Sequence, residues 1–223
     1  MVALRADAAR NRTALIEAAR ATFARRGLDA PLDEIARCAG IGNATLYRHF
    51  PTRRALVAAV YADALADVVR ACERALDAAD PWEGFCSHVE FVCRLQADNR
   101  GLADLLTRRI DAEPPIERLR ERARLLFARL ADRAKEAGAL RPDFCVEDLS
   151  LLLMANAGLI HRTADAAPGA WARFVHFVLD GLRREAARMP APPSPGLRAV
   201  RAAMASPATR PGPEPRTASA ARH

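Results

Sequence analysis

The chain has 223 residues, of which 51% are hydrophobic and 5% aromatic, and its formal net charge is +7. This apolar fraction is enough to form a sizeable buried core, so intrinsic disorder of the whole chain is excluded. The longest strongly apolar run, residues 149–160, is shorter than the ~20 residues of a membrane-spanning helix. The first residues carry mixed charge instead of the apolar stretch of a signal peptide, so we expect a cytoplasmic protein with no membrane partner.

The positive charge is unevenly distributed. Residues 1–60 hold ten Arg against five acidic residues, residues 61–189 hold 19 basic against 21 acidic residues, and residues 190–223 hold five Arg against one Glu. The excess therefore lies at the two ends of the chain, where a polyanion such as nucleic acid can bind. GC-rich genes also favour Arg over Lys, so the arginine bias by itself does not separate these two explanations.

Apolar residues recur at spacings of three and four along most of the chain, and no segment alternates β-branched residues with a period of two. The sequence therefore predicts an all-α fold. A first helix is expected over residues 6–26, ending at Gly27, which can adopt the left-handed conformation of a helix C-cap. Later helices, separated by Pro and Gly, are expected over residues 52–79, 82–98, 101–111, 115–138, 146–163 and 169–188.

The composition changes after Met189. Eight of the 15 prolines lie between Pro190 and Pro215, among Ala, Ser, Thr and Arg. Such a segment buries too little apolar surface to offset the entropy of ordering, so residues 190–223 are expected to form a disordered tail. Before this tail, the sequence predicts an N-terminal domain over residues 1–51 and a larger helical domain over residues 52–189.

The strongest local pattern is PLDEIARCAGIGNATLYRHFPTRRAL at residues 31–56. A short apolar helix face precedes a glycine, a lone apolar residue and a second short helix over residues 44–50, which is the pattern of a helix-turn-helix. Glycine suits the turn because it adopts positive φ without a steric penalty. The residues expected to form the core of this motif are Ile35, Ala36, Gly40, Ile41, Leu46 and Phe50.

The outward face of the second short helix is polar. An ordinary solvated face carries Glu and Lys, whereas this one carries hydroxyl and guanidinium groups, which suit base edges and phosphates in a major groove. Packing against neighbouring residues is the alternative for the two flanking side chains. The expected outward residues are Ala44, Thr45 and Arg48 at the centre, with Tyr47 and His49 at the sides.

The residues that follow predict a phosphate site. Thr52 can cap the next helix, and the free amides of that helix together with Arg53 can bind a phosphate. The helix macrodipole disfavours a cation in the first turn, so a structural reason for arginine at this position is hard to find. This favours a DNA contact for Arg53.

The run DEIARCAGIGNATLYRHFPTRRALVAAVY resembles the DNA-binding domain of the TetR family of transcriptional regulators, and the resemblance covers residues 11–61. It rests on the joint occurrence of I-A-x-x-A-G-I, T-L-Y-x-H-F and a basic residue three positions after Phe50, preceded by F-x-x-x-G from Phe23 to Gly27. The resemblance implies a homodimer that binds a palindromic double-stranded DNA operator. It also implies a small-molecule effector, of unknown identity, which binds the C-terminal domain and releases the DNA.

The family pattern also assigns roles by position. Arg54 departs from it, because related sequences usually carry an acidic residue there, and it adds positive charge near the DNA backbone. Pro31 departs as well: it suits a first helical position but leaves the cap to Ala30, a poor capping residue. The residues implied to read or approach bases are Asn43, Ala44, Thr45 and Arg48, and those implied to hold phosphates are Tyr47, His49, Thr52 and Arg53.

The last two predicted helices of residues 52–189 are candidates for a dimer interface. Residues 149–160 are apolar nearly all round, and such a helix in a small domain usually lies between its own core and a partner. Burial within one monomer is the alternative, and an operator with two half-sites favours the dimer. The expected interface residues are Leu152, Gly158, Phe174, Val178 and Gly181.

An effector cavity needs a few polar groups among apolar walls. Polar or aromatic residues within apolar helical stretches are therefore candidates for lining it, although each also fits an ordinary core or surface position. The candidates are Trp82, His88, Phe91, Asn156 and His161.

An enzyme is the competing class of protein. The sequence contains no nucleophile elbow, phosphate-binding loop, dinucleotide fingerprint or zinc-protease motif, so no catalytic residue, metal ligand or cofactor is assigned. The five cysteines include no C-x-x-C pair, which indicates reduced thiols. Cys86 and Cys93 lie seven residues apart on an apolar helix face. Two alternatives stay open for the cysteines: a redox-sensing DNA-binding regulator, and an enzyme that uses one Cys thiol with His88 or His161.

Overall fold

The all-α prediction is confirmed by the computed structural model, which describes residues 2–108 and 112–205. Within these ranges the only β-type pairing is a single bridge between Leu140 and Arg183. The helices are α1 (Val2–Arg26), α2 (Leu32–Cys38), α3 (Asn43–His49), α4 (Arg53–Leu76), α5 (Pro81–Asp98), α6 (Arg100–Thr107), α7 (Pro114–Glu136), α8 (Val146–Thr163), α9 (Ala170–Leu182) and α10 (Gly196–Ala205), with a short 3-10 helix at Arg184–Ala186.

Local sequence chemistry sets several helix ends. Gly27 has φ +79°, and its N–H donates to the Phe23 carbonyl at 2.8 Å, so it ends α1 as the sequence predicts. The Thr52 hydroxyl accepts a hydrogen bond from the Ala55 N–H at 3.1 Å and caps α4. Asp80 caps α5 in the same way, through the Trp82 N–H at 2.7 Å.

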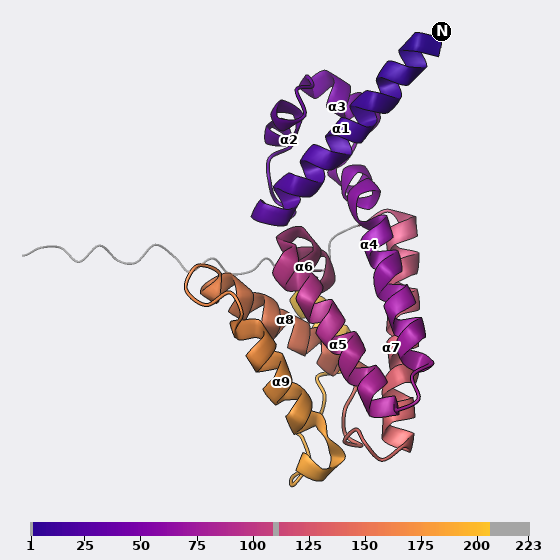
Figure 1. Ribbon diagram of the computed structural model, residues 1–223, viewed down its shortest axis with the longest axis vertical. Coiled ribbons are helices and arrows are strands. Elements are labelled where there is room, and N and C mark those ends of the chain that lie inside the picture. The colour runs from indigo at the N-terminus through magenta and orange to yellow at the C-terminus, as the bar shows by residue number, and fades with distance from the viewer. Residues whose placement is uncertain (1, 109–111, 206–223) are drawn as a thin grey trace, which may run out of the picture.

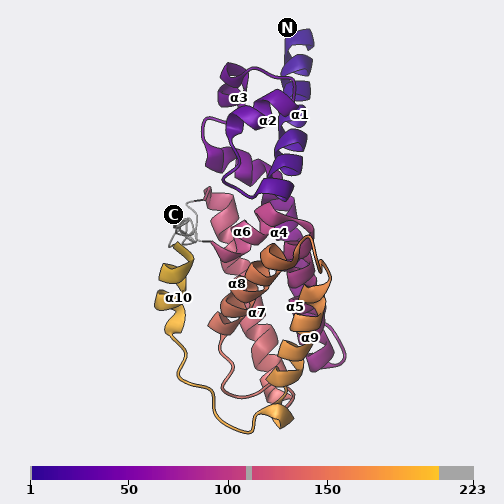
Figure 2. The ribbon, with the colours of Figure 1, turned by 90° about the vertical axis from the view of Figure 1, so that its left-hand side faces the viewer.

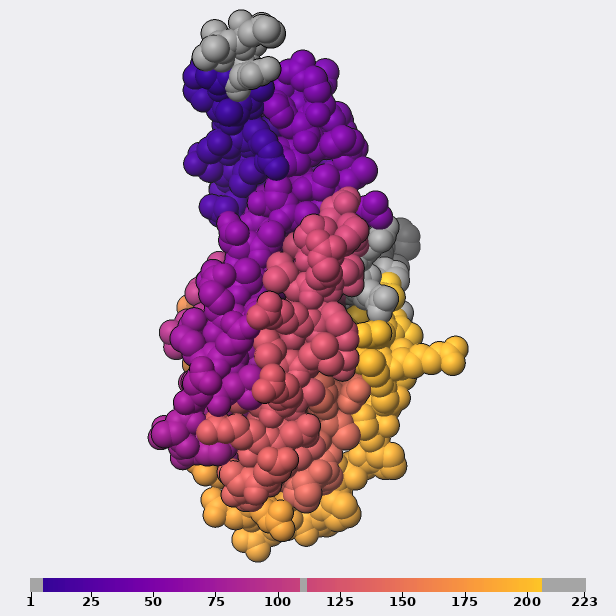
Figure 3. Space-filling model, turned by 90° about the vertical axis from the view of Figure 1, so that its right-hand side faces the viewer, coloured from indigo at the N-terminus to yellow at the C-terminus, as the bar shows by residue number. Residues whose placement is uncertain are grey.

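Two hydrophobic cores share the long helix α4. Figure 1 shows α1, α2 and α3 grouped at one end of an elongated molecule, with α4 running from them into the larger helical domain. The first core joins α1, α2 and α3 to the first half of α4 and to α6, and the second joins the rest of α4 to α5, α7, α8 and α9. Figure 3 shows α4 and α7 side by side along one face of this larger domain.

Phe85 lies at the centre of the second core and has no exposed surface. Its ring centroid lies 5.7 Å from those of Trp82 and Phe127, and 5.5 Å from that of Phe144, which meets it edge-on. Aromatic pairs at such separations add to the stabilisation from area burial alone. This cluster ties α5 and α7 to the loop before α8.

The prediction of a disordered tail is wrong for residues 196–205, which form α10. The average composition hides an apolar stripe, because Leu197, Val200 and Met204 recur at spacings of three and four. Val200 is only 3% exposed, and α10 lies beside α8 (Figure 2). The remainder of the predicted tail, residues 206–223, lies outside the described residues.

Three other helix ends, those of α9, α2 and α6, differ from the predictions. α9 ends at Leu182 instead of residue 188, because the next residues pair with the loop after α7: the Arg184 N–H donates to the Ala139 carbonyl at 2.9 Å. Pro31 is extended, with φ −60° and ψ 134°, and is itself the N-cap of α2, so it is not the first helical residue and Ala30 is not the cap. The predicted helix over 101–111 ends at Thr107, and residues 109–111 lie outside the described residues.

Candidate nucleic-acid interface

α2 and α3 form the helix-turn-helix. Gly40 has φ +67°, and the Ile41 N–H after it donates to the Ala36 carbonyl at 2.9 Å, which closes the turn. A side chain at this φ is strained, so glycine is the residue that the turn requires. Of the six expected core residues, Ile35, Ala36, Leu46 and Phe50 are buried, and Ile41 packs at the edge of the same core.

The outward face of α3 is open to solvent at the end of the molecule (Figure 1). Asn43, Ala44, Tyr47 and Arg48 are exposed, and 48% of the Tyr47 surface is accessible. Thr45 is half-buried, so it lies closer to the edge of this face than its predicted central position. The exposed side chains supply an amide, a phenol and a guanidinium, the groups that contact phosphates and base edges.

Asn43 and His49, at the two ends of α3, also have structural contacts. The Asn43 amide donates to the Asp33 carboxylate at 3.1 Å and so ties α3 to α2. The His49 ring is half-buried, with its centroid 6.5 Å from that of Phe50. Its buried Nε2 has no hydrogen-bond partner among the described residues. Packing therefore accounts for part of the His49 side chain, and its DNA contact stays a prediction.

Arg53 has a structural role that the sequence did not reveal. Its Nη1 donates to the Leu28 carbonyl at 2.7 Å and to the Ala30 carbonyl at 2.6 Å. The guanidinium thus holds the loop between α1 and α2 from the first turn of α4. Arginine at this position therefore has a structural role, contrary to the prediction, and the phosphate contact of Arg53 stays a prediction.

Arg53→Ala is expected to destabilise the protein by about 1–3 kcal/mol without any DNA present, because it removes two hydrogen bonds from a charged donor and leaves their carbonyls unpaired. Urea unfolding of the free protein measures this loss. The exposed Arg48 is the control, and Arg48→Ala is expected to change the unfolding free energy by less than about 0.5 kcal/mol. Equal stability of the two variants would contradict the anchoring role.

The same loop is held from α6. The Leu28 N–H donates to the Asp104 carboxylate at 2.8 Å, and Arg108 pairs with Asp29 at 2.8 and 3.3 Å. At the start of α6, the Tyr61 hydroxyl donates to the Asn99 side-chain oxygen at 2.9 Å. We call residues 27–31 the reader loop, because α2 and α3 follow it directly. Sequence reasoning missed Asp104 and Arg108, since no local pattern links them to a loop more than 70 residues away.

None of the predicted effector residues lines the four cavities described within residues 2–108 and 112–205, and their effector role stays a prediction. Trp82, His88 and Asn156 are buried, Phe91 is half-buried, and His161 lies on the exposed side of α8. The Asn156 amide donates to the Gln96 side-chain oxygen at 2.9 Å, so it joins α8 to α5 within the core. Burial lowers the pKa of His88 to about 4, so this side chain is neutral near pH 7.

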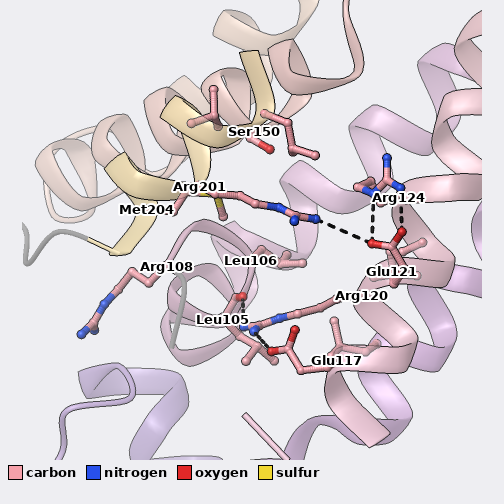
Figure 4. A pocket seen from close by; sticks show the side chains of 15 residues that line it. Leu105, Leu106, Arg108, Glu117, Arg120, Glu121, Arg124, Ser150, Arg201 and Met204 are labelled. Atoms are coloured by element: carbon pink, nitrogen blue, oxygen red, sulfur yellow. Dashed lines mark hydrogen bonds and ion pairs between the residues drawn. The ribbon is translucent and has the colours of Figure 1, made fainter. Parts of the chain in front are cut away.

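A cavity of about 220 Å³ lies instead between α4, α6, α7, α8 and α10, and none of the five predicted residues lines it. Sequence reasoning missed it because α10, one of its walls, was expected to be disordered. Its labelled lining residues in Figure 4 are Leu105, Leu106, Arg108, Glu117, Arg120, Glu121, Arg124, Ser150, Arg201 and Met204.

The predicted dimer residues divide between the core and the surface. Leu152 is 8% exposed and belongs to the core of its own chain, which corrects its assignment to an interface. Phe174 and Val178 are half-buried against the same core, whereas Gly158 and Gly181 are exposed. The exposed apolar side chains of α8 and α9 include Leu151 and Phe177, at 39% and 56%, which the sequence analysis did not name.

Cys86 and Cys93 are expected to be poorly reactive thiols. Cys93 is buried and Cys86 is half-buried, and burial raises the pKa of both to about 12. The reactive form of cysteine is the thiolate, which is scarce near pH 7 at such pKa values. The redox-sensor and thiol-enzyme alternatives are therefore not favoured.

The fold and the exposed α3 define a class of protein: a helix-turn-helix DNA-binding regulator with a larger helical domain. Residues 15–60 match the family model for bacterial regulatory proteins of the tetR family. Residues 80–184 match the model for the C-terminal domain of SbtR-like transcriptional regulators. No helix of the described residues is both long enough and apolar enough to cross a membrane.

Solved structures of regulators resemble the chain over most of its length. A TetR transcriptional regulator from Streptomyces coelicolor is 32% identical, with a TM-score of 0.51, over 77% of this chain and 98% of that one. A TetR regulatory protein from Mycobacterium vanbaalenii is 36% identical, with a TM-score of 0.49, over 81% and 99%. RolR, solved with resorcinol, is 24% identical, with a TM-score of 0.53, over 85% and 100%. No curated protein sequence matches. The chain belongs to the TetR family of transcriptional regulators.

Proposed function

We propose that this regulator is a repressor that binds a palindromic operator as a homodimer and is released from it by a small-molecule effector. The observation that carries the proposal is the exposed polar face of α3, with Tyr47 and Arg48 outward and Leu46 and Phe50 buried behind them. A helix presented in this way fits a major groove, where guanidinium and phenol groups contact guanine edges and phosphates.

The effector signal reaches α3 through the reader loop. One route is α4, which runs from its cap at Thr52 into the larger domain, and the contacts of α6 with the reader loop supply another. α6 lines the cavity with Leu105 and Leu106, and it holds the reader loop through Asp104 and Arg108. A ligand that displaces α6 then moves α2 and α3, so the two reading helices of a dimer no longer match the spacing of the half-sites. A coupling of ~1–3 kcal/mol changes operator occupancy several-fold or more.

Two relatives support an organic effector. RolR was solved with resorcinol, and FadR from Bacillus subtilis was solved with stearoyl-CoA. Both are less than 25% identical to this chain, so they support an organic ligand as a class and leave its identity open.

Operator binding is expected to depend on Arg48. Arg48→Ala removes a guanidinium from the exposed centre of α3 and is expected to weaken binding by about 1–3 kcal/mol, or roughly 5- to 150-fold, with relaxed preference at the contacted base pair. Tyr47→Ala is expected to weaken binding to every sequence. Gel-shift titration with the DNA upstream of its own gene measures both losses. Arg129→Ala removes an equal charge from the exposed side of α7 and serves as the control. Equal affinities for all four proteins would overturn the role of α3.

The homodimer is expected to form through the exposed faces of α8 and α9. Phe177→Asp places a charge where 56% of an aromatic side chain is exposed, so it disfavours an apolar interface without disturbing the core. Sedimentation velocity is expected to show a dimer for the wild type and a monomer for this variant. Leu125→Asp, on the exposed face of α7, is the matched control and is expected to stay dimeric. A dimer that survives Phe177→Asp would place the interface elsewhere.

A further inference from the structure

After α9 the chain turns back along the molecule. We call residues 183–195 the strap; it leads from the end of α9 to α10 beside α8 (Figure 2). The strap is fixed at separate points: the Arg184 N–H donates to the Ala139 carbonyl at 2.9 Å, and the Ala191 N–H donates to the Asp143 carboxylate at 2.7 Å. Four of its last six residues are proline, which limits the conformations of the strap. These restraints on the strap limit where α10 can lie on the surface.

α10 is held at that place mainly by side chains. Leu197, Val200 and Met204 share its inward face, and Val200 is 3% exposed while Ala199 is exposed on the outer face. Arg201 lies 3.7 Å from the Glu121 carboxylate on α7, and both side chains are close to half exposed, so this ion pair is weak. A helix of ten residues is marginal in water by itself, so α10 depends on this docking to stay helical.

The docked helix forms one wall of the half-open cavity that lies between it and α4, α6, α7 and α8. The walls are mainly aliphatic, from Leu65, Val68, Leu105, Leu106, Leu197, Val200 and Met204. The charged lining residues are four arginines, Arg108, Arg120, Arg124 and Arg201, against two glutamates, Glu117 and Glu121. Arg108 is paired with Asp29 and Asp104 outside the lining, so the other three arginines against two glutamates leave an excess of one positive charge beside the aliphatic walls.

Glu121 is the central carboxylate of this lining. Arg124 donates to both of its oxygens, from Nε to Oε2 at 3.0 Å and from Nη2 to Oε1 at 2.6 Å, and Arg201 from α10 approaches the same Oε2 (Figure 4). Arg120 is held by Glu117 at 2.8 Å and by the Leu105 carbonyl at 2.7 Å. Glu121 thus interacts with two guanidiniums. An added anion can pair with Arg201, and Glu121 then remains paired with Arg124.

We propose that α10 is a lid over an effector site for an organic anion with an apolar body. The anionic group pairs with Arg201 and Arg124, and the apolar body lies between Leu105 and Val200. The lid opens to admit the ligand, and the ligand then holds it closed through Arg201. The link from this site to DNA release rests on the proposed function, because it runs through α6 and the reader loop.

The opening of the lid is tested with anilinonaphthalene sulfonate, an anion with an apolar body that fluoresces in apolar sites, added to the full chain. Val200→Asp undocks α10, so we expect several-fold higher dye emission than for the wild type and loss of hydrogen-exchange protection in residues 197–205. Ala199→Asp, one residue away on the exposed face, is expected to behave like the wild type. Leu197→Asp, on the same inward face of α10, is a second opening variant that keeps Arg201 in the chain. Unchanged emission and unchanged exchange in both opening variants, at wild-type melting temperature, would overturn the lid.

The preference for an anion is tested with α10 in place. Arg124→Gln alone is expected to weaken binding of the sulfonate dye at least fivefold and to leave binding of the uncharged dye Nile red within twofold. Equal losses for both dyes would overturn the anion site. Gel shifts on the same proteins without dye separate the two proposals. If the wild type fails to bind operator DNA, the proposed function is wrong and the dye results still decide the lid.

Discussion

Gly101→Val is expected to destabilise the protein by about 3 kcal/mol or more, because it inserts a side chain where three helices meet without a gap. Even a Cβ at this position would collide with the Tyr61 hydroxyl and would lie 2.9 Å from the Phe23 Cβ and 3.0 Å from the Phe23 carbonyl oxygen. The Phe23 carbonyl oxygen belongs to the backbone of α1 and cannot rotate away as a side chain can, so α1 and α6 must separate. Thermal and urea unfolding measure the loss. The same variant is expected to weaken operator binding, since α6 holds the reader loop.

A double-mutant cycle with the smaller substitution Gly101→Ala is the control for this prediction. Tyr61→Phe removes the hydroxyl with which the new Cβ would collide. The loss in free energy of unfolding for the double variant is therefore expected to be smaller than the sum of the losses for the two single variants. The hydroxyl also donates to Asn99, and the cost of losing that bond is measured by Tyr61→Phe alone. Strict additivity would contradict the tight contact between α6 and α4.

Acid is expected to destabilise the protein through His88. Burial lowers the pKa of this side chain from 6.5 to about 4 in the folded state, so the unfolded chain binds the proton first as the pH falls. The stability that comes from keeping His88 neutral is therefore complete above pH 6.5, is lost as the pH falls through the window from 6.5 to about 4, and levels off below it. The shift corresponds to about 3 kcal/mol across this window.

Replacing His88 isolates this effect from the titration of carboxylates. His88→Leu keeps an apolar side chain beside Phe127 and removes the titrating group, so its free energy of unfolding is expected to fall about 3 kcal/mol less than that of the wild type between pH 7 and pH 4. His161→Gln, at an exposed position, is expected to follow the wild-type curve. Parallel curves for the wild type and His88→Leu would show that His88 protonates without cost.

Local chemistry made much of the DNA-binding end predictable from the sequence. Gly27 and Gly40 both adopt positive φ, and Thr52 caps α4, because each of these features depends on neighbours within four residues. The contacts of Arg53, Asp104 and Arg108 with the reader loop join residues 23 to 79 positions apart, and no periodic pattern encodes them.

The larger domain was less predictable, for a different physical reason. A proline-rich average composition concealed the stripe of Leu197, Val200 and Met204, so a lid was expected to be a disordered tail. On α9, Phe174 was expected to lie in the dimer interface, but spacing alone could not show that Phe177 is the exposed side chain while Phe174 packs inward. The side of a helix that faces the core depends on how the other helices pack around it.

The central claim, that α3 reads DNA sequence as part of a dimer, is tested most directly by selecting bound duplexes from a random DNA pool with the full chain. We predict enrichment of an inverted repeat whose half-site centres are about one helical turn or a multiple of it apart, with preference lost at specific base pairs for Arg48→Ala. Recovered duplexes with no shared motif, or the same motif for the wild type and Arg48→Ala, would contradict the claim.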